Sequence, residues 1–321
     1  MRNLLLKRKI TKNIKNIYEK NLFFLPLKTQ FHFALRLYRI TGNKKYILPI
    51  LNYSKVILPQ TILMIEKFSK RTFLKMLSER LFFSLPSFRK IFKERKKFFK
   101  KRKELLYYFR LIENLYLLKN FGFFETPYKS FFEKGLNSLS KIKFDEILFE
   151  KKLFSIFSTQ IINYVYYLND LKIADFQKKL LENFHSFFLK EKNETFHKFQ
   201  NKIYGLTHFI ICDSHYYQKF ASKRKNEWIL KIFEKEISKI LKTNVDLVAE
   251  VGLCFKLCRK SSFGIEMIEK YLIREFSWKL KYYPYGGKNL ARAEHRNILT
   301  YMFLRGFKKL YPGPNLRKYF L

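Results

Sequence analysis

The sequence predicts an all-α fold, arranged as a ring or array of helical hairpins that resembles an α/α toroid. Residues that break helices are scarce, with 10 Gly and 8 Pro in 321 residues. Segments in which apolar and polar residues alternate, as in half-buried strands, are few. Several pairs of helix-like segments are joined by short turns, and no repeat of fixed period is visible, which favours an irregular ring over a regular superhelix.

The first hairpin is predicted over residues 31–46. Phe31, Ala34 and Tyr38 follow the spacing of one apolar helical face. Gly42 then supplies a residue that tolerates left-handed backbone, and the chain after it can restart a helix.

The second hairpin is predicted over residues 160–176, with a turn at residues 169–170 and a helix that resumes over residues 171–176. The third is predicted as helices at residues 246–258 and 265–276, with a turn between them. Residues 203–220 form a further helix that is apolar on nearly all sides, as buried helices are.

The chain is strongly basic. It carries 66 Lys and Arg against 26 Asp and Glu, a formal net charge of +40. Such a charge attracts nucleic acid or an anionic membrane surface. The alternative is compositional drift, because Lys, Asn, Ile, Phe and Tyr all have AT-rich codons and are raised together, with 37 Phe and 21 Tyr. Both explanations stay open.

Residues 89–104 are the most basic stretch. They form either a helix that follows phosphates, with Phe92, Phe98 and Phe99 as anchors on a membrane or on bases, or a solvated outer helix whose Phe side chains face the core.

Domain organisation and location follow from composition. We expect a basic N-terminal segment, residues 1–20, and one helical domain, residues 21–321, with 47% hydrophobic residues to form its core. The three cysteines lack the even count of a disulfide framework. The N-terminus lacks a secretory apolar core, and no uninterrupted apolar run reaches the length of a transmembrane segment. The predicted location is therefore cytoplasmic.

The spacing of some histidines and cysteines permits a metal site, but it does not require one. On a helix over residues 203–220, the side chains of His208, Cys212 and His215 would share one stripe, and Glu250 and Cys254 are also four residues apart. Core histidines and buried cysteines are the ordinary alternative. Gly-rich phosphate loops, a serine nucleophile elbow and dinucleotide fingerprints are missing from the sequence, so the common nucleotide enzymes are excluded and no cofactor is identified.

Glu250 lies among apolar residues. A carboxylate buried there without a partner would cost several kcal/mol, so it must meet a cation or a donor, or keep its proton with a raised pKa. A raised pKa suits a general acid, with Asp213 or Glu294 as the ionised partner. The alternative is a structural Glu bonded to Arg296 or to a helix terminus.

Residues 294–297, Glu294, His295, Arg296 and Asn297, are predicted to open a helix after the glycine-containing loop at residues 284–287. A loop followed by a helix N-terminus is a natural anion site, which Arg296 would strengthen. The alternative is an ordinary helix cap with a surface salt bridge.

Five segments carry a resemblance to a known family: residues 27–46, 202–210, 246–252, 294–298 and 312–316. Together they resemble a bacterial family, domain of unknown function 3541, over nearly the whole chain. The resemblance implies an all-helical domain and no assigned reaction.

The leading hypothesis is a polar central pocket that binds, or also hydrolyses, a small polar ligand, glycan-like or peptide-like by analogy with other toroids. Glu250 would donate the proton, and Asp213 or Glu294 would act as base. The ligand-binding side chains would be Tyr204, His208, His295, Arg296 (as anion anchor) and Asn297.

The alternative hypothesis is a non-catalytic basic helical protein that binds RNA, a ribosomal surface or an anionic membrane. Its lysines would gather on one face, and the polar residues named above would then be core pairs.

Overall fold

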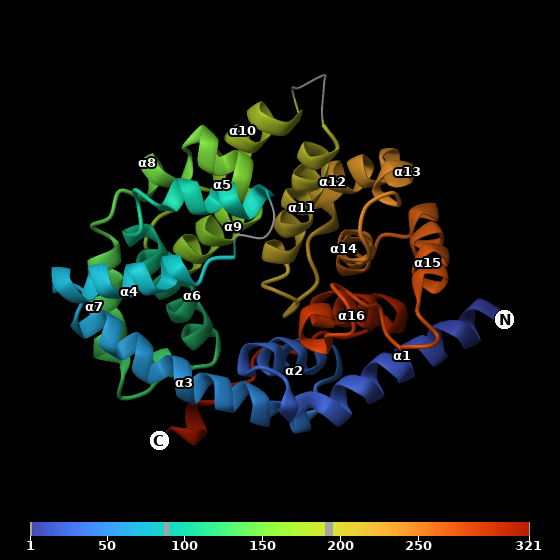
Figure 1. Ribbon diagram of the computed structural model, residues 1–321, viewed down its shortest axis with the longest axis horizontal. Coiled ribbons are helices and arrows are strands. Elements are labelled where there is room, and N and C mark those ends of the chain that lie inside the picture. The colour runs from blue at the N-terminus through green and yellow to red at the C-terminus, as the bar shows by residue number, and fades with distance from the viewer. Residues whose placement is uncertain (1, 87–89, 190–194, 321) are drawn as a thin grey trace. The chain divides into compact units, whose positions relative to one another are not determined.

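The computed structural model describes residues 2–86, 90–189 and 195–320, and over these ranges the fold is all-α, as predicted (Figure 1). Sixteen α-helices and no strand are found there, with one isolated bridge between Ser277 and Tyr282. The chain groups into two units. The first comprises Met1–Tyr53 and Leu206–Pro314, and the second comprises Ser54–Gly205 and Asn315–Leu321.

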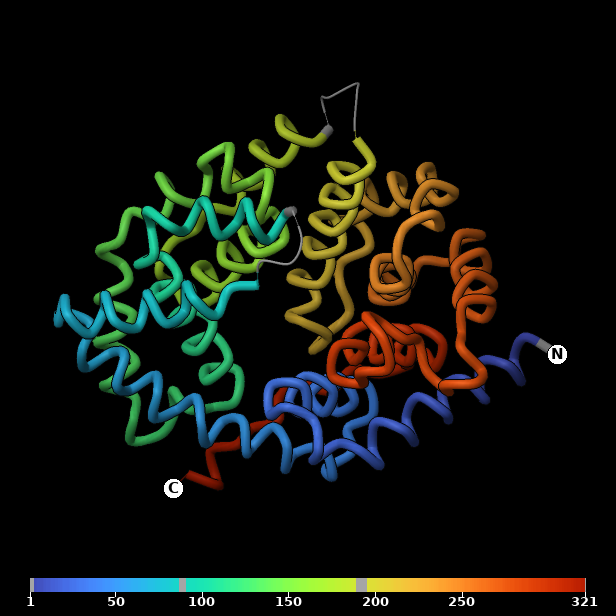
Figure 2. The backbone as a smooth tube through the Cα atoms, in the orientation of Figure 1, coloured from blue at the N-terminus to red at the C-terminus, as the bar shows by residue number. Residues whose placement is uncertain are grey.

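Helix α16 is the centre of the first unit. It packs against α14, α1 and α2, and α14 packs in turn against α15 (Figures 1 and 2). Ten of the 13 residues of α14 and ten of the 16 residues of α16 are buried, so buried polar groups on them must find partners inside the protein. The helices of this unit are α1 (Arg2–Asn21), α2 (Leu27–Thr41), the start of α3 (Ile47–Glu66), the end of α11 (Phe196–Asp213), α12 (Lys223–Lys235), α13 (Ile237–Ile240), α14 (Val245–Leu257), α15 (Phe263–Glu275) and α16 (Leu290–Arg305).

Helix α1 covers the basic N-terminal segment. Ile10, Ile14 and Tyr18 are fully buried along one side of it, at the spacing of an amphipathic helix. The Tyr18 hydroxyl donates a hydrogen bond to the Leu290 carbonyl at 2.9 Å. Residues 2–20 therefore contribute a packed helix to the first unit.

Helices α6 and α9 form the core of the second unit. They pack against each other, α4 packs against α6, and α5, α8 and α10 pack against α9 (Figure 1). The helices of this unit are α4 (Arg71–Phe83), α5 (Lys90–Phe99), α6 (Glu104–Asn120), α7 (Lys129–Leu139), α8 (Phe144–Leu148), α9 (Lys151–Asp170) and α10 (Gln177–Phe184), together with the end of α3 and the start of α11.

The basic stretch at residues 89–104 contains α5 and the loop before α6. Phe98 and Phe99 on α5 are 3% and 0% exposed, so two of its three phenylalanines belong to the core. Arg89 lies outside the described residues.

The first predicted hairpin is confirmed. Helix α2 ends at Thr41, and Gly42 has a φ of 66°, with its N–H donating to the Tyr38 carbonyl at 2.8 Å. Glycine removes the steric cost of the left-handed region at such a helix end.

The third predicted hairpin is confirmed as α14 and α15.

The second predicted hairpin is wrong after its turn. Residues 171–176 are a connection, and the next helix begins at Gln177. Lys172 has a φ of 59°, and the Ile173 N–H donates to the Leu168 carbonyl at 2.9 Å. This hydrogen bond ends the helix, and Lys172 takes the left-handed conformation that glycine usually takes at such a position.

The predicted helix over residues 203–220 is too long, because α11 ends at Asp213. His215, Tyr216 and Tyr217 follow with φ values of 51°, 54° and 68°. Three consecutive non-glycine residues in the left-handed region cost conformational energy, which the surrounding structure must offset. The Ser214 hydroxyl helps, because it accepts a hydrogen bond from the Tyr217 N–H at 3.0 Å.

One segment within the described residues, Lys44–Glu66, is long and apolar enough to cross a membrane by length and composition alone, and its most apolar window has a mean hydropathy of 1.2. Asn52, Ser54 and Gln60 interrupt it, so it is not a continuous apolar run. Half of its most apolar window is buried within the protein, and a core helix meets the same criteria.

Candidate functional site

Four helices of the first unit bring ionisable side chains into what we call the His–Glu–Arg cluster. The inner faces of these helices are apolar, so an ionisable residue on such a face is an exception to its surroundings. The cluster consists of His32 and Arg36 on α2, His208 on α11, Glu250 on α14, and Glu294 and His295 on α16.

Glu250 is held by residues of α11. Its Oε2 accepts a hydrogen bond from the Thr207 hydroxyl at 3.0 Å, and its Oε1 lies 3.7 Å from His208 Nε2. The Glu250 side chain is 3% exposed, whereas that of His208 is 16% exposed. The imidazole therefore lies between the buried carboxyl and solvent.

Glu294 forms a second pair of the same kind. His32 Nδ1 lies 2.7 Å from its Oε2 and 2.8 Å from its Oε1. The Glu294 side chain is 5% exposed and that of His32 is 25% exposed. The ring of His295 lies 5.3 Å from the His32 ring, centroid to centroid. Each buried carboxyl is thus reached from solvent through a histidine.

Burial controls the protonation of the whole cluster. It raises the pKa of Glu250 and of Glu294 to about 7 each, although Arg36 and, for Glu250, the Thr207 hydroxyl act in the opposite direction. Burial and the positive charge of Arg36 lower the pKa of His208 to about 3, and burial, His32 and Arg36 lower that of His295 to about 3.

The two His–Glu contacts have salt-bridge distances, but their pKa shifts favour uncharged groups on both sides. Burial also lowers the pKa of His32 well below its ordinary value. We therefore interpret the His32–Glu294 contact as a hydrogen bond between a neutral imidazole and a carboxyl group that titrates near neutral pH, rather than as an ion pair. His208 and Glu250, 3.7 Å apart, are in contact but beyond hydrogen-bond distance.

Arg36 connects the two pairs electrostatically. Its charge acts on the pKa of both carboxyls and of all three imidazoles. Its Nε is buried and has no hydrogen-bond partner among the described residues, and its guanidinium carbon lies 5.7 Å from the centre of the Tyr217 ring. The Tyr217 hydroxyl is likewise buried without a partner in this part of the chain.

An unsatisfied buried donor costs about 1–3 kcal/mol, and two of them close together are uncommon in a folded protein. Tyr217 is moreover placed by the strained turn at residues 215–217. Strained backbone of this kind gathers at functional sites. Arg36 Nε and the Tyr217 hydroxyl are therefore polar groups beside the cluster that the described residues leave unsatisfied.

The structure places Asp213 in a different network. Its carboxylate accepts hydrogen bonds from the Ser222 N–H at 2.8 Å, from Asn226 Nδ2 at 2.8 Å and from Lys225 Nζ at 3.1 Å. Partial burial opposes ionisation, but these donors hold the pKa of Asp213 below its ordinary value. These contacts tie the end of α11 to the start of α12.

Helix α16 begins at Leu290, four residues before the predicted start, with Asn289 as its cap. The predicted helix N-terminus at residues 294–297 is therefore wrong, and Glu294 lies one turn inside the helix. The cap residue Asn289 accepts a hydrogen bond from the Arg292 N–H at 3.1 Å. This leaves residues 294–297 to point their side chains into the protein.

Arg296 and Asn297 hold the loop before α16. Arg296 Nε lies 2.9 Å from Asp246 Oδ1, and its Nη1 donates to the Pro284 carbonyl at 2.7 Å. Asn297 is fully buried; its Oδ1 accepts from the Tyr283 N–H, and its Nδ2 donates to the Tyr283 and Ala293 carbonyls, all within 2.9 Å. Both side chains are satisfied by the protein itself.

Tyr204 and the possible metal ligands His208, Cys212 and His215 lie on or just after α11. Tyr204 lies on the part of α11 that belongs to the second unit. His215 lies beyond the end of α11, so it leaves the stripe of His208 and Cys212. Among the residues that the structure describes, no group of three or more His, Cys, Asp and Glu could hold a metal ion.

Sequence reasoning missed His32, Arg36, Thr207 and Tyr217. A usable signal existed for the first two, because they stand four residues apart on an apolar helix, the same kind of exception that singled out Glu250. No signal existed for Tyr217, since its position depends on a turn that the sequence does not announce.

No curated protein and no solved structure matches this chain. The family model for a domain of unknown function, DUF3541, matches residues 7–319. The match covers both units and all members of the His–Glu–Arg cluster, and the chain therefore belongs to the DUF3541 family.

Proposed function

We propose that the His–Glu–Arg cluster binds a small polar molecule with anionic oxygens and hydrolyses a glycosidic or peptide-like bond in it. The observation that carries this proposal is the pair of orphaned donors, Arg36 Nε and the Tyr217 hydroxyl, beside two buried His–Glu pairs. Binding and hydrolysis rest on different groups of the cluster.

Binding rests on Arg36 and Tyr217. A guanidinium group presents its N–H donors in a fixed fork that matches a carboxylate, and a phenol hydroxyl adds a third donor. The neighbouring imidazoles are neutral, so they do not compete with Arg36 as cations. We infer that the ligand carries a carboxylate.

Hydrolysis rests on Glu250 and Glu294. A carboxyl group with a pKa of about 7 exchanges its proton readily near neutral pH, which suits a general acid or base. In the proposed step Glu294, held by His32, takes a proton from water as the water oxygen attacks. Glu250, held by Thr207, gives its proton to the leaving oxygen or nitrogen.

The test of binding uses imidazole ¹⁵N NMR of the full chain. Glucuronate and N-acetylalanine are titrated as charged probes, with glucose and N-acetylalaninamide as uncharged counterparts. We expect the charged probes to shift the His32 and His208 signals with an affinity about tenfold higher than the uncharged ones. Arg36→Met should remove this preference, while Arg224→Met, at an exposed residue of α12, should keep it.

The same samples test turnover with an aryl glucuronide and an N-acetylated dipeptide. Glu250→Gln and Glu294→Gln should each lower the rate by about 100-fold or more. Equal affinity for charged and uncharged probes, or equal losses in both arginine variants, would contradict the binding proposal. Absence of turnover with tight probe binding would reduce the cluster to a binding site.

A further inference from the structure

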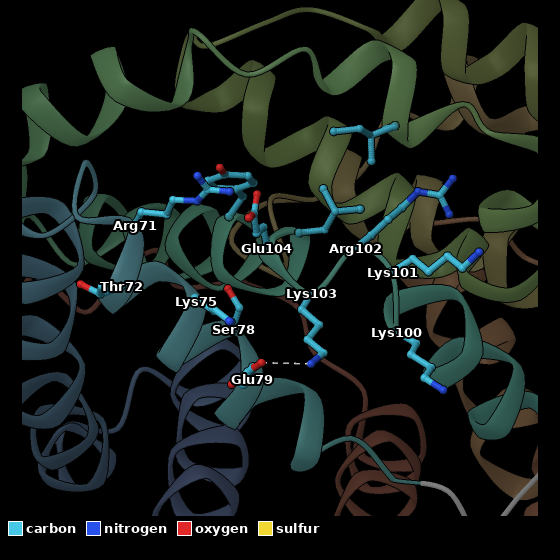
Figure 3. Close-up of a pocket in the computed structure, with 13 residues that line it drawn as sticks. Arg71, Thr72, Lys75, Ser78, Glu79, Lys100, Lys101, Arg102, Lys103 and Glu104 are labelled. Atoms are coloured by element: carbon cyan, nitrogen blue, oxygen red, sulfur yellow. Dashed lines mark hydrogen bonds and ion pairs between the residues drawn. The ribbon is translucent and has the colours of Figure 1, made fainter.

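The second unit contains a pocket of its own, with a volume of about 950 Å³ (Figure 3). Pockets that hold one small organic molecule span roughly 300–1,000 Å³, so this volume suits a single ligand of that size. The pocket is formed by α4, by the loop before α6, by the start of α6 and by Ile147 of α8.

The lining carries an excess of positive charge. Arg71, Lys75, Lys100 and Lys101 have no ion-pair partner among the described residues, and Glu104 is the lining acid without one. The other lining charges are neutralised.

Two ion pairs account for these neutralised charges. Lys103 lies 3.2 Å from Glu79, as the dashed line in Figure 3 shows, and Arg102 lies 3.1 Å from Glu150. In the same view Arg71 extends along the pocket over Glu104, whereas Lys100 and Lys101 point outward at its edge. Of these cations without an ion pair, Arg71 and Lys75 lie on α4, the helix that carries Ser78, whereas Lys100 and Lys101 lie in the loop before α6.

Ser78 adds a neutral donor to the wall. It is 1% exposed, and its hydroxyl has no hydrogen-bond partner within the described ranges. A hydroxyl that is buried without a partner at the wall of a cationic pocket is the group that a bound oxyanion would satisfy.

The other side of the pocket is apolar and planar. Leu105 is 6% exposed, and Tyr108 is half-buried with its ring 5.8 Å from that of Phe68. A flat ring packs well against an aromatic side chain. Cations at one end and an aromatic wall at the other fit a molecule that has an anionic group at one end and a planar ring at the other.

We propose that this pocket binds a nucleoside monophosphate, with the phosphate on Arg71, Lys75 and the Ser78 hydroxyl and the base against Tyr108. Side chains supply all these contacts, which is consistent with a sequence that lacks a glycine-rich phosphate loop. An RNA strand or a lipid headgroup shares the phosphate chemistry, but the volume of one small ligand favours the mononucleotide.

Isothermal titration calorimetry of the full chain tests the proposal with AMP. Adenosine and inorganic phosphate serve as half-ligands, and we expect each to bind at least about tenfold more weakly than AMP. The double variant Arg71→Gln/Lys75→Gln should weaken AMP binding about tenfold or more. The control Lys134→Gln/Lys141→Gln removes the same charge from exposed positions of the second unit and should change it less than about twofold.

Ser78→Ala separates a positioning role from a structural one. Because the hydroxyl has no partner, its removal should leave the melting temperature unchanged while weakening AMP about threefold to tenfold. Equal weakening by both double variants would show attraction by bulk charge and overturn the proposal. So would tighter binding of a short single-stranded RNA, or of vesicles with anionic lipid, that the pocket variants leave unchanged.

Discussion

The two units present ionisable groups in opposite ways. The His–Glu–Arg cluster buries carboxyls and imidazoles, so that burial raises the pKa of the carboxyls and lowers that of the imidazoles, whereas the pocket of the second unit carries exposed basic side chains. Burial makes a group sensitive to pH, while exposure makes its interactions sensitive to salt. The first site should therefore respond to protons and the second to ionic strength.

The largest effect that sharpens this comparison is expected from Glu250→Gln. Burial raises the pKa of this carboxyl from its ordinary value of 4.5 to about 7 in the folded chain. The contribution of Glu250 to the free energy of unfolding is fully present below pH 4.5 and is lost as the pH rises through 7. The loss is about 3 kcal/mol, because a pKa difference of one unit corresponds to about 1.4 kcal/mol. The glutamine variant should therefore be more stable than the wild type at pH 8 and similar to it at pH 5.

Urea unfolding at the two pH values measures this difference. The histidines contribute with the opposite sign, because their lowered pKa destabilises the fold as the pH falls below 6.5, but they are the same in both proteins. A stability difference that is equal at pH 5 and pH 8 would mean that the carboxyl does not titrate as its burial requires.

A second effect comes from Asn297→Ala, which removes a polar side chain three residues after Glu294. This change leaves the N–H and the carbonyl of Tyr283 without their partner, which should cost about 2 kcal/mol. Neither group titrates, so thermal unfolding should show the same loss at pH 5 and at pH 8. A loss that changes with pH would show that Asn297 is coupled to the cluster and would blur the distinction.

The smallest effect is expected from Arg71→Gln/Lys75→Gln in the second unit. Both side chains are exposed and lack an ion-pair partner among the described residues, so unfolding free energy should change by less than about 0.5 kcal/mol. Denaturation at about 0.05 M and about 0.5 M salt measures this. A larger change would mean that these cations support the fold, as the groups around Asn297 do.

The sequence predicts helix ends best where the residue at the turn is one that favours the left-handed conformation, such as glycine. Gly42 ends α2 as expected, because glycine enters the left-handed region without strain. Lys172 and His215 end helices in the same conformation, and nothing in a lysine or a histidine announces it. The wrong predictions at residues 171–176 and 214–220 have this cause, whereas the wrong start of α16 comes from the cap at Asn289.

The candidate site was predictable in part for a similar reason. An ionisable residue on an apolar helix is visible in the sequence, and Glu250 and His208 do lie together. What satisfies such a residue is not visible. The donors around Asp213 come from a later turn, and the carbonyl that binds Arg296 comes from a loop, so their roles depend on the fold.

The turn at residues 215–217 sets a limit for anyone who engineers this protein. Glycine or asparagine at His215 or Tyr216 would relieve unfavourable backbone and raise thermal resistance, as such replacements commonly do. The same relief would loosen the phenol that the turn presents to Arg36. A heat-resistant version of the chain would then weaken the ligand binding that we propose for the cluster.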